Sequence, residues 1–255
     1  MNRKINLFLL VAMLISTASF AQSLSGTTWS YTTRMYGSNK ISTATTYFHF
    51  DSPTKVIWML GTPDGKAFPV AIGNYNPVKG EITFPASTRV NQYSELFKYG
   101  RDIVFSFQPS KCTMQVLSGE AQKHGLMTLL YNSLQQFTVV KEKYPFQPSK
   151  TMVGQTWGGY VGYGGDSFEY LTIQFKNQYE ADITVEYDDG SQTVTCPYVC
   201  LGNIVAVHSG DHFTNLVLIG QYFNGSNSIG FCWEGIEGRE VEHFDQPCSS
   251  FSRIK

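Results

Sequence analysis

Short runs of alternating apolar and polar residues are the feature that most limits what this chain can fold into. The clearest run is ADITVEY at residues 181–187, in which every second residue is apolar. LTIQF at residues 171–175 and IVFSF at residues 103–107 repeat the pattern. Successive side chains of a strand point to opposite faces, so such runs indicate antiparallel strands with one face on a core and one in solvent.

Turn-forming sequences separate these runs. They are PDG at residues 63–65, KYG at 98–100, DDG at 188–190 and FNGSN at 223–227. Glycine beside Asp, Asn or Pro between apolar runs favours tight hairpin turns. Beyond the first residues only 119–130 is a candidate helix, so the sequence predicts an all-β fold.

The sequence also begins twice. Its first opening is LSGTTWSY, which contains Trp29, and the second is MVGQTWGGY, which contains Trp157. Further similarities follow in the same order along the chain, which indicates a duplicated domain rather than a solenoid of at least three shorter repeats. The matched segments are 24–31 with 152–160, 47–65 with 172–190, and 136–141 with 250–255.

The duplication predicts the domain boundaries. We expect a signal peptide at residues 1–21, a first β-barrel repeat at 22–141, a linker at 142–151 and a second β-barrel repeat at 152–255. At roughly 8–12 residues per strand and turn, each repeat would hold about eight to ten strands. That number suffices for two tandem small antiparallel meander barrels, whose closure removes aggregation-prone edges. A sandwich is the alternative. A single outer-membrane barrel is disfavoured, because its strands need about 9–11 residues and the alternating runs are shorter.

The first residues have the features of a secretory signal. Two basic residues precede an apolar run at 7–15, and the triplet SFA, which ends at Ala21, has small residues where signal peptidase reads the chain. The apolar run is too short for a bilayer, which needs about 20 residues, so we expect cleavage after Ala21 rather than a membrane anchor. The first cysteine is Cys112, which excludes a lipoprotein signal. The protein is therefore expected to be exported, to the periplasm or outside the cell.

Composition limits the partners. Charged residues make up 15% of the chain, against about 25% in typical proteins, and the formal net charge is −1. The chain has no run of Lys or Arg such as phosphate binding needs, so nucleic acid is excluded as a partner. No second apolar stretch is long enough for a transmembrane helix.

The five cysteines do not determine whether the protein has disulfides. Their number is odd, and an exported protein permits disulfides, but the sequence does not fix which residues pair. A zinc site built on Cys196 and Cys200, which share a strand face, lacks the second cysteine pair of such sites. The five are Cys112, Cys196, Cys200, Cys232 and Cys248.

The two openings carry a family resemblance. Trp29 follows Gly26, and Trp157 follows Gly154, each three residues later, and a strand-like stretch YNPVKGEITF lies at residues 75–84. These features resemble the lipocalin (calycin) superfamily, in which a Gly-x-Trp element one residue shorter begins the first strand of an up-and-down barrel. The resemblance implies an exported bacterial protein of two tandem lipocalin-like barrels, each with a Trp closing one end around a ligand cavity.

The function that these features predict is binding without catalysis or cofactor. A barrel cavity would hold a small apolar or amphipathic ligand, with Trp29 and Trp157 as candidate contacts, although packing at the barrel end is the simpler role for both. The alternative is a surface module for carbohydrate or protein. It would use Tyr160 and Tyr163 in the glycine-rich GGYVGYGG at residues 158–165.

Motifs of catalysis and metal binding are weak. The chain has no nucleophile elbow, phosphate-binding glycine loop or HExxH. HSGDH, with His208, Asp211 and His212, holds donors that zinc accepts, but its Ser-Gly predicts an exposed polar turn after a strand at 202–207.

Two further sets of residues favour structural roles. Asp182 and Glu186 could form a glycosidase pair, yet they share the strand face opposite the apolar one. His49 and His124 are candidate haem ligands, but a histidine between two phenylalanines of a strand, as His49 is, points away from their common face.

Overall fold

The computed structural model describes most of the chain between residues 24 and 255. The predicted signal peptide and the candidate helix at 119–130 lie outside the described residues. These are 24–36, 41–61, 67–88, 90, 102–117, 137–143, 152–162, 168–202, 204–209, 217–222, 228–234 and 249–255.

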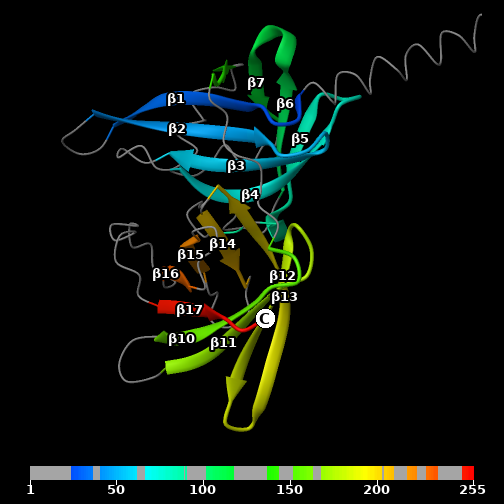
Figure 1. Cartoon of the computed structure of the whole chain (residues 1–255). Coiled ribbons are helices and arrows are strands. Elements are labelled where there is room, and N and C mark those ends of the chain that lie inside the picture. Colours follow the sequence, from blue (N-terminus) through cyan, green and yellow to red (C-terminus); the bar gives the residue numbers. More distant parts are fainter. Residues whose placement is uncertain are drawn as a thin grey trace, which may run out of the picture.

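The first nine strands form one antiparallel sheet in the order β8-β7-β6-β5-β4-β3-β2-β1-β9 (Figure 1). Apart from β9, each strand pairs with its neighbours in sequence, which is a meander. The strands are β1 (Thr28–Tyr36), β2 (Ile41–Phe50), β3 (Lys55–Gly61), β4 (Ala67–Asn76), β5 (Glu81–Phe84), β6 (Ile103–Gln108), β7 (Thr113–Val116), β8 (Phe137–Thr138) and β9 (Val140–Lys141), with 3-10 turns η1 (Ala86–Thr88) and η3 (Pro109–Lys111).

The two edges of this sheet meet at a single residue. β8 pairs with β7 and β9 pairs with β1, and only Val139 separates the two short strands. The backbone N–H of Val139 donates to the carbonyl of Cys112 at 2.9 Å. The segment 137–141 therefore brings the ends of the sheet together, and we call this unit the first barrel.

The last eight strands form a closed barrel in the order β10 to β17. Its closing contact joins β10 to β17, with Trp157 opposite Arg253. The expected all-β fold of antiparallel meander barrels is thus confirmed, while the likeness to lipocalins stays a prediction. The strands are β10 (Thr156–Gly162), β11 (Phe168–Phe175), β12 (Glu180–Tyr187), β13 (Gly190–Leu201), β14 (Ile204–His208), β15 (Val217–Tyr222), β16 (Ser228–Glu234) and β17 (Ser249–Arg253).

Aromatic rings fill the described interior of the first barrel. Phe48 has no exposed surface, and its ring lies 5.2 Å from Phe105, 6.1 Å from Phe84 and 6.2 Å from Trp58, centroid to centroid. Most of these contacts are tilted or edge-to-face, which aromatic quadrupoles favour. Every second residue of β2, β3 and β6 contributes to this core, as the alternation predicts.

The second barrel has a more aliphatic interior. Leu171, Ile173 and Val185, from β11 and β12, are fully buried and pack with Trp157. The ring of Tyr198 lies 4.6 Å from that of Phe175, and its hydroxyl donates to the carbonyl of Asn177 at 2.8 Å. The described strands of both barrels therefore present packed side chains inward.

Both barrels begin with the same backbone geometry. Gly26 and Gly154 have φ values of +76° and +81°, a region that side chains with a Cβ rarely adopt. Each donates its N–H to the carbonyl of the last residue in the second strand of its barrel. Gly26 donates to Phe50 at 2.7 Å, and Gly154 donates to Phe175 at 2.8 Å. A glycine is needed here because the chain must turn back against that strand before it enters the first one.

The tryptophans of the two openings also have equivalent contacts. Trp29 is 5% exposed and Trp157 is fully buried. The indole N–H of Trp29 donates to the Thr27 hydroxyl, and that of Trp157 donates to the Gln155 side-chain oxygen, both at 3.1 Å. This burial, with a local partner for each N–H, agrees with the packing role.

A third apolar cluster lies between the two barrels. It joins the outer faces of β3 and β4 in the first barrel to those of β13 and β14 in the second, which lie opposite each other in Figure 1. These outward-pointing residues are at most 4% exposed, so here the outer faces are not in solvent. The cluster consists of Ile57, Met59, Ile72, Val90, Val199, Leu201 and Ala206, with Tyr47, Tyr179 and Ile204 at its margin.

Candidate functional site

The outer face of β10 and β11 carries a pair of tyrosines. Tyr160 is 63% exposed, and its ring lies 5.0 Å from that of Tyr170 at an angle of 66°. The two residues are direct cross-strand partners, and such pairs are the unit of side-chain contact in a sheet. The neighbouring Val161 points into the core. The pair is therefore held on the solvent side by the register of the two strands.

Gly158 explains how this face is shaped. It lies two residues before Tyr160, on the same side of β10, where a Cβ would collide with the Tyr170 hydroxyl and would lie 2.6 Å from Cδ1 of Ile254. The missing side chain thus leaves room for Tyr170 and Ile254 to cover the strand from its two sides. Thr172, which pairs with Gly158, points the same way. We call Tyr160, Tyr170, Thr172 and Ile254 the tyrosine face.

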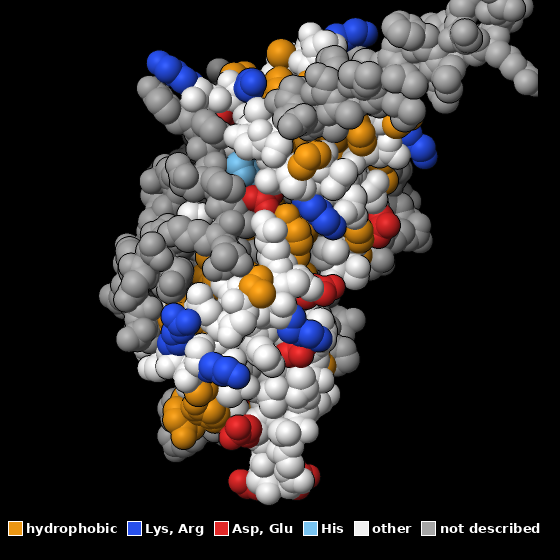
Figure 2. Space-filling view, turned by 45° about the vertical axis from the view of Figure 1, so that its right-hand side comes forward, with side chains coloured by type: hydrophobic (Ala, Val, Ile, Leu, Met, Phe, Trp, Pro, Cys, Tyr) orange, Lys and Arg blue, Asp and Glu red, His pale blue; other side chains and the backbone are white. Residues whose placement is uncertain are grey.

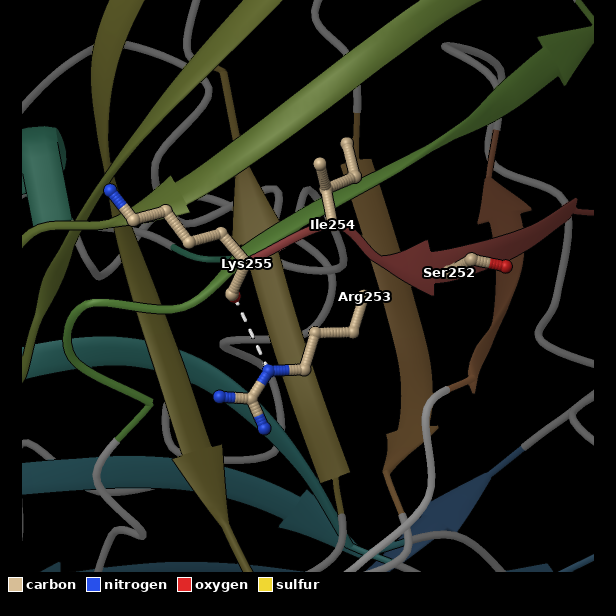
Figure 3. A pocket seen from close by; sticks show the side chains of 4 residues that line it. All are labelled: Ser252, Arg253, Ile254 and Lys255. Atoms are coloured by element: carbon tan, nitrogen blue, oxygen red, sulfur yellow. Dashed lines mark hydrogen bonds between the residues drawn. The ribbon is translucent and has the colours of Figure 1, made fainter.

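A groove borders the tyrosine face at the end of the chain. It has a volume of about 440 Å³ and is lined by Ser252, Arg253, Ile254 and Lys255 (Figure 3). The Nε of Arg253 donates to the carbonyl oxygen of Lys255 at 3.3 Å. Figure 3 shows the side chain of Ile254 lying over β10 and that of Arg253 pointing away from it. The guanidinium group of Arg253 therefore lies beside the tyrosine face rather than on it.

One face of the molecule is mixed in charge. On the face that Figure 2 shows, Lys and Arg side chains are scattered among Asp and Glu, and hydrophobic side chains form small groups. Among the described residues of the second barrel, Tyr160 and Ile254 are the two most exposed large hydrophobic side chains, at 63% and 57%. Tyrosine is enriched at binding interfaces relative to the rest of the protein surface.

The structure separates most residues that the sequence proposed for binding. Trp29 and Trp157 lie in two different cores. Tyr160 belongs to the tyrosine face, whereas Tyr163 lies outside the described residues. The other members of the face were not predicted, because only the strand register reveals them. The sequence signal for Tyr170 was the pair Gly158-Gly159 in β10. A strand residue without a side chain leaves space that a large side chain of a neighbouring strand can fill.

His208 does not lie in an exposed turn, and this prediction was wrong. β14 continues to His208, which pairs with Val217 of β15 and is fully buried, and Ser209 is 3% exposed. Asp211 and His212 lie outside the described residues. Within the part of the chain that the structure describes, no three His, Cys, Asp or Glu side chains gather in a way that could hold a metal ion.

Asp182 and Glu186 do not have the spacing of a glycosidase pair. They lie four residues apart on β12, hence about 13 Å along the strand, beyond the roughly 5–9.5 Å that such mechanisms use. Asp182 accepts a hydrogen bond from Thr195 at 2.6 Å and lies 3.3 Å from Nζ of Lys176. Both carboxylates point outward from the barrel, as the alternation predicts, and lie on the solvent side of the sheet.

His49 points away from the first core, as predicted, yet it is fully buried. Its Nδ1 lies 2.9 Å from the Thr28 hydroxyl, and its Nε2 lies 3.8 Å from Oδ1 of Asp51. A haem ligand needs a free nitrogen facing a large cavity, and His49 instead lies among side chains. His124 lies outside the described residues.

Cys196 and Cys200 are thiols within the second core, and Cys112 is an exposed thiol at the left-handed φ of 52°. Burial, with a smaller contribution from Asp182, raises the pKa of the Cys196 thiol to about 12. Only the thiolate reacts with alkylating agents. The side chains of Cys232 and Cys248 lie outside the described residues.

We therefore expect iodoacetamide at about pH 8 to alkylate Cys112 at least about a hundredfold faster than Cys196 in the native protein. Peptide mapping by mass spectrometry after timed quenching gives the two rates. In a denaturant the difference should vanish, which serves as the control. Equal rates in the native protein would show that the second barrel opens readily or that Cys196 is not buried.

No helix in the described ranges is long and apolar enough to cross a membrane. Comparison of the chain with protein-family models, with curated proteins and with solved structures finds no match.

Proposed function

We propose that the protein is an exported, non-enzymatic binding protein that recognises a neutral glycan through the tyrosine face. The observation that carries this proposal is Tyr160, a large aromatic side chain left 63% exposed on a regular strand and held by its partner Tyr170. A tyrosine fixed in this way presents rigid, amphipathic area with little loss of entropy on binding. One ring face can pack on the C–H face of a sugar while hydroxyl groups bind its oxygens.

The surroundings of the pair favour a carbohydrate over other ligands. Thr172 and Ser252 flank Gly158 on its two neighbouring strands and supply hydroxyl groups. The ring of Tyr160 and the exposed side chain of Ile254 supply apolar area. The four residues of the tyrosine face carry no charge, and Arg253 points away from it (Figure 3), so we favour a neutral ligand over an anionic one.

The packed interior favours the surface over a cavity as the binding site. In the first barrel the rings of Phe48, Trp58, Phe84 and Phe105 lie 5.2 to 6.2 Å apart, centroid to centroid, which is the range of packed aromatic pairs. Small barrels are commonly filled by their own side chains. A ligand in that space would have to displace these rings, which costs more than stacking on an exposed one.

Replacing Tyr160 with alanine is expected to weaken glycan binding at least about tenfold, which corresponds to about 1.4 kcal/mol. Tyrosines at the centre of a binding surface commonly contribute this much or more. Affinity electrophoresis through gels that contain individual neutral polysaccharides measures the effect, since binding retards the protein.

Tyr187→Ala is the matched control for this experiment. Tyr187 is 40% exposed and lies at the end of β12, on the sheet face opposite Tyr170, whose partner on β12 is Glu186. The Y187A protein should be retarded as strongly as the wild type. Equal retardation of Y160A and wild type, or passage of the wild type through every neutral polysaccharide unretarded, would refute the proposed function.

A further inference from the structure

A buried carboxylate of the first barrel is bound by the second barrel. Asp51 lies in the turn between β2 and β3, and its side chain has no exposed surface. Its Oδ2 accepts hydrogen bonds from the Tyr179 hydroxyl at 2.8 Å and from Nε2 of Gln178 at 3.1 Å. Both donors lie in the turn between β11 and β12. We call these three residues the Asp51 contact.

The Asp51 contact lies at the margin of the apolar cluster between the barrels, to which Tyr179 belongs. The ring of Tyr179 also lies beneath the ammonium group of Lys55, with Nζ 5.6 Å from its centroid. A buried carboxylate is costly unless hydrogen bonds replace its water. Opening the interface would expose Asp51 to water, whereas removing its partners with the interface closed would not. The contact therefore favours one relative placement of the two barrels.

His49 lies beside this contact and is buried with it. Its Nε2 is 3.8 Å from Oδ1 of Asp51, and its Nδ1 is 2.9 Å from the Thr28 hydroxyl. Burial lowers the pKa of His49 from its usual 6.5, and the negative charge of Asp51 opposes this effect without cancelling it. At neutral pH the imidazole is therefore uncharged. Its Nδ1 shares a hydrogen bond with the Thr28 hydroxyl, and its Nε2 lies nearest to the Asp51 carboxylate.

We propose that the two barrels are held together by the Asp51 contact and that His49 makes this interface sensitive to acid, so that protonation of its ring accompanies opening of the interface. The cross-strand partner of His49 is Ile57, which belongs to the cluster between the barrels, so opening gives the imidazolium the water that the closed interface withholds. The titratable or charged groups nearest to His49 come from four segments. They are Asp51 in the turn after β2, Lys55 on β3, Tyr179 from the second barrel and Glu142 just after β9. The Glu142 carboxylate accepts a hydrogen bond from Ser30.

The direction of the effect follows from proton linkage. The closed form holds His49 with a lowered pKa, and in the open form the ring is solvated and has a pKa near 6.5. Between these two values the open form binds more protons, so acid favours it. The equilibrium constant for opening should rise by up to about tenfold for each unit by which the pH falls below about 6.5, until the pKa of the closed form is reached.

Side-chain footprinting of the full chain with hydroxyl radicals, with correction for the intrinsic reactivity at each pH, tests this proposal between about pH 7.5 and 5. The side chain of Met59, in the cluster between the barrels, should lose protection on acidification. That of Met114, in the core of the first barrel, should keep it, because both barrels stay folded. Unchanged protection of Met59 would overturn the proposal. So would equal loss at Met114, because that is unfolding of the whole barrel.

Three variants separate the roles of the residues. His49→Gln keeps a side chain that can bond Thr28 but removes the titrating ring, so its interface should stay protected down to about pH 5. Tyr179→Phe removes one donor to Asp51 and should raise the labelling rate of Met59 at every pH by about tenfold or less. Gln174→His places a histidine at the corresponding position of the second barrel, where the side chain is exposed, and should change nothing. An H49Q protein that still opens in acid would overturn the role of His49.

Discussion

Replacing Phe48 with alanine is expected to reduce the free energy of unfolding of the first barrel by about 3–5 kcal/mol. Phe48 is fully buried on β2, and its ring contacts those of Trp58, Phe84 and Phe105 at centroid distances of 5.2 to 6.2 Å. The substitution removes these ring contacts and leaves a cavity that the remaining rigid rings cannot fill. Urea unfolding at equilibrium, followed by circular dichroism, measures the loss.

Two controls frame this result. Phe48→Leu retains most of the apolar volume and should cost about half as much or less. Val78→Ala changes a side chain that is 80% exposed, and its effect should stay within about 0.5 kcal/mol. A loss below about 1 kcal/mol for F48A would mean that the aromatic cluster of the first barrel is loosely packed, and this would reopen the cavity as a binding site.

Trp157→Ala should have an effect of the same size on the second barrel, about 3–5 kcal/mol. Trp157 is fully buried at the opening of β10, and it pairs with Ile173 of β11 and with Arg253 of β17. Its removal therefore weakens the core at the place where the first and last strands of the barrel join. Thermal unfolding by calorimetry would detect a lower transition temperature.

Trp157→Phe distinguishes packing from hydrogen bonding at this position. Phenylalanine keeps much of the buried area but removes the indole N–H that donates to Gln155. We expect a loss of about 1–2 kcal/mol, intermediate between W157A and the wild type. If W157F and W157A lost the same amount, the hydrogen bond rather than the ring area would stabilise the opening of the barrel.

The strands were predictable where one face of a strand meets a core and the other meets solvent. The alternating runs at 103–107, 171–175 and 181–187 lie within β6, β11 and β12. Period-two alternation carries this information locally, because each run needs only its own residues to show two different faces. The all-β fold followed directly from these runs and from the turns between them.

The contact between the barrels could not be predicted from local pattern. Val199 and Leu201 of β13 and Ile57 of β3 point outward from their barrels and are nevertheless buried. In the sequence they make YVCL and VIW continuous apolar runs, which look alike whether the second face meets a core or another domain. The burial of the Asp51 side chain has the same origin, since its carboxylate binds a turn that lies about 130 residues further along the chain.

The binding surface was partly predictable. Tyr160 was named because it lies in a glycine-rich stretch, and the structure shows that it is exposed. Tyr170 and Ile254 were missed because their proximity to Gly158 depends on which residues of β11 and β17 lie opposite β10. A register of this kind is set by the whole barrel, and single strands do not encode it.

The closing segments of the two barrels set the order in which the protein can complete its fold as it is synthesised. Trp29 of β1 pairs with Lys141, and Trp157 of β10 pairs with Arg253, in each case about a hundred residues later in the chain. Until those residues emerge, the opening strand keeps a row of unsatisfied backbone groups that another chain could bind. Nascent chains that stall before residue 137 or before residue 249 would therefore be the species most prone to aggregate. A factor that shields the opening strand during synthesis would protect the protein at these two stages.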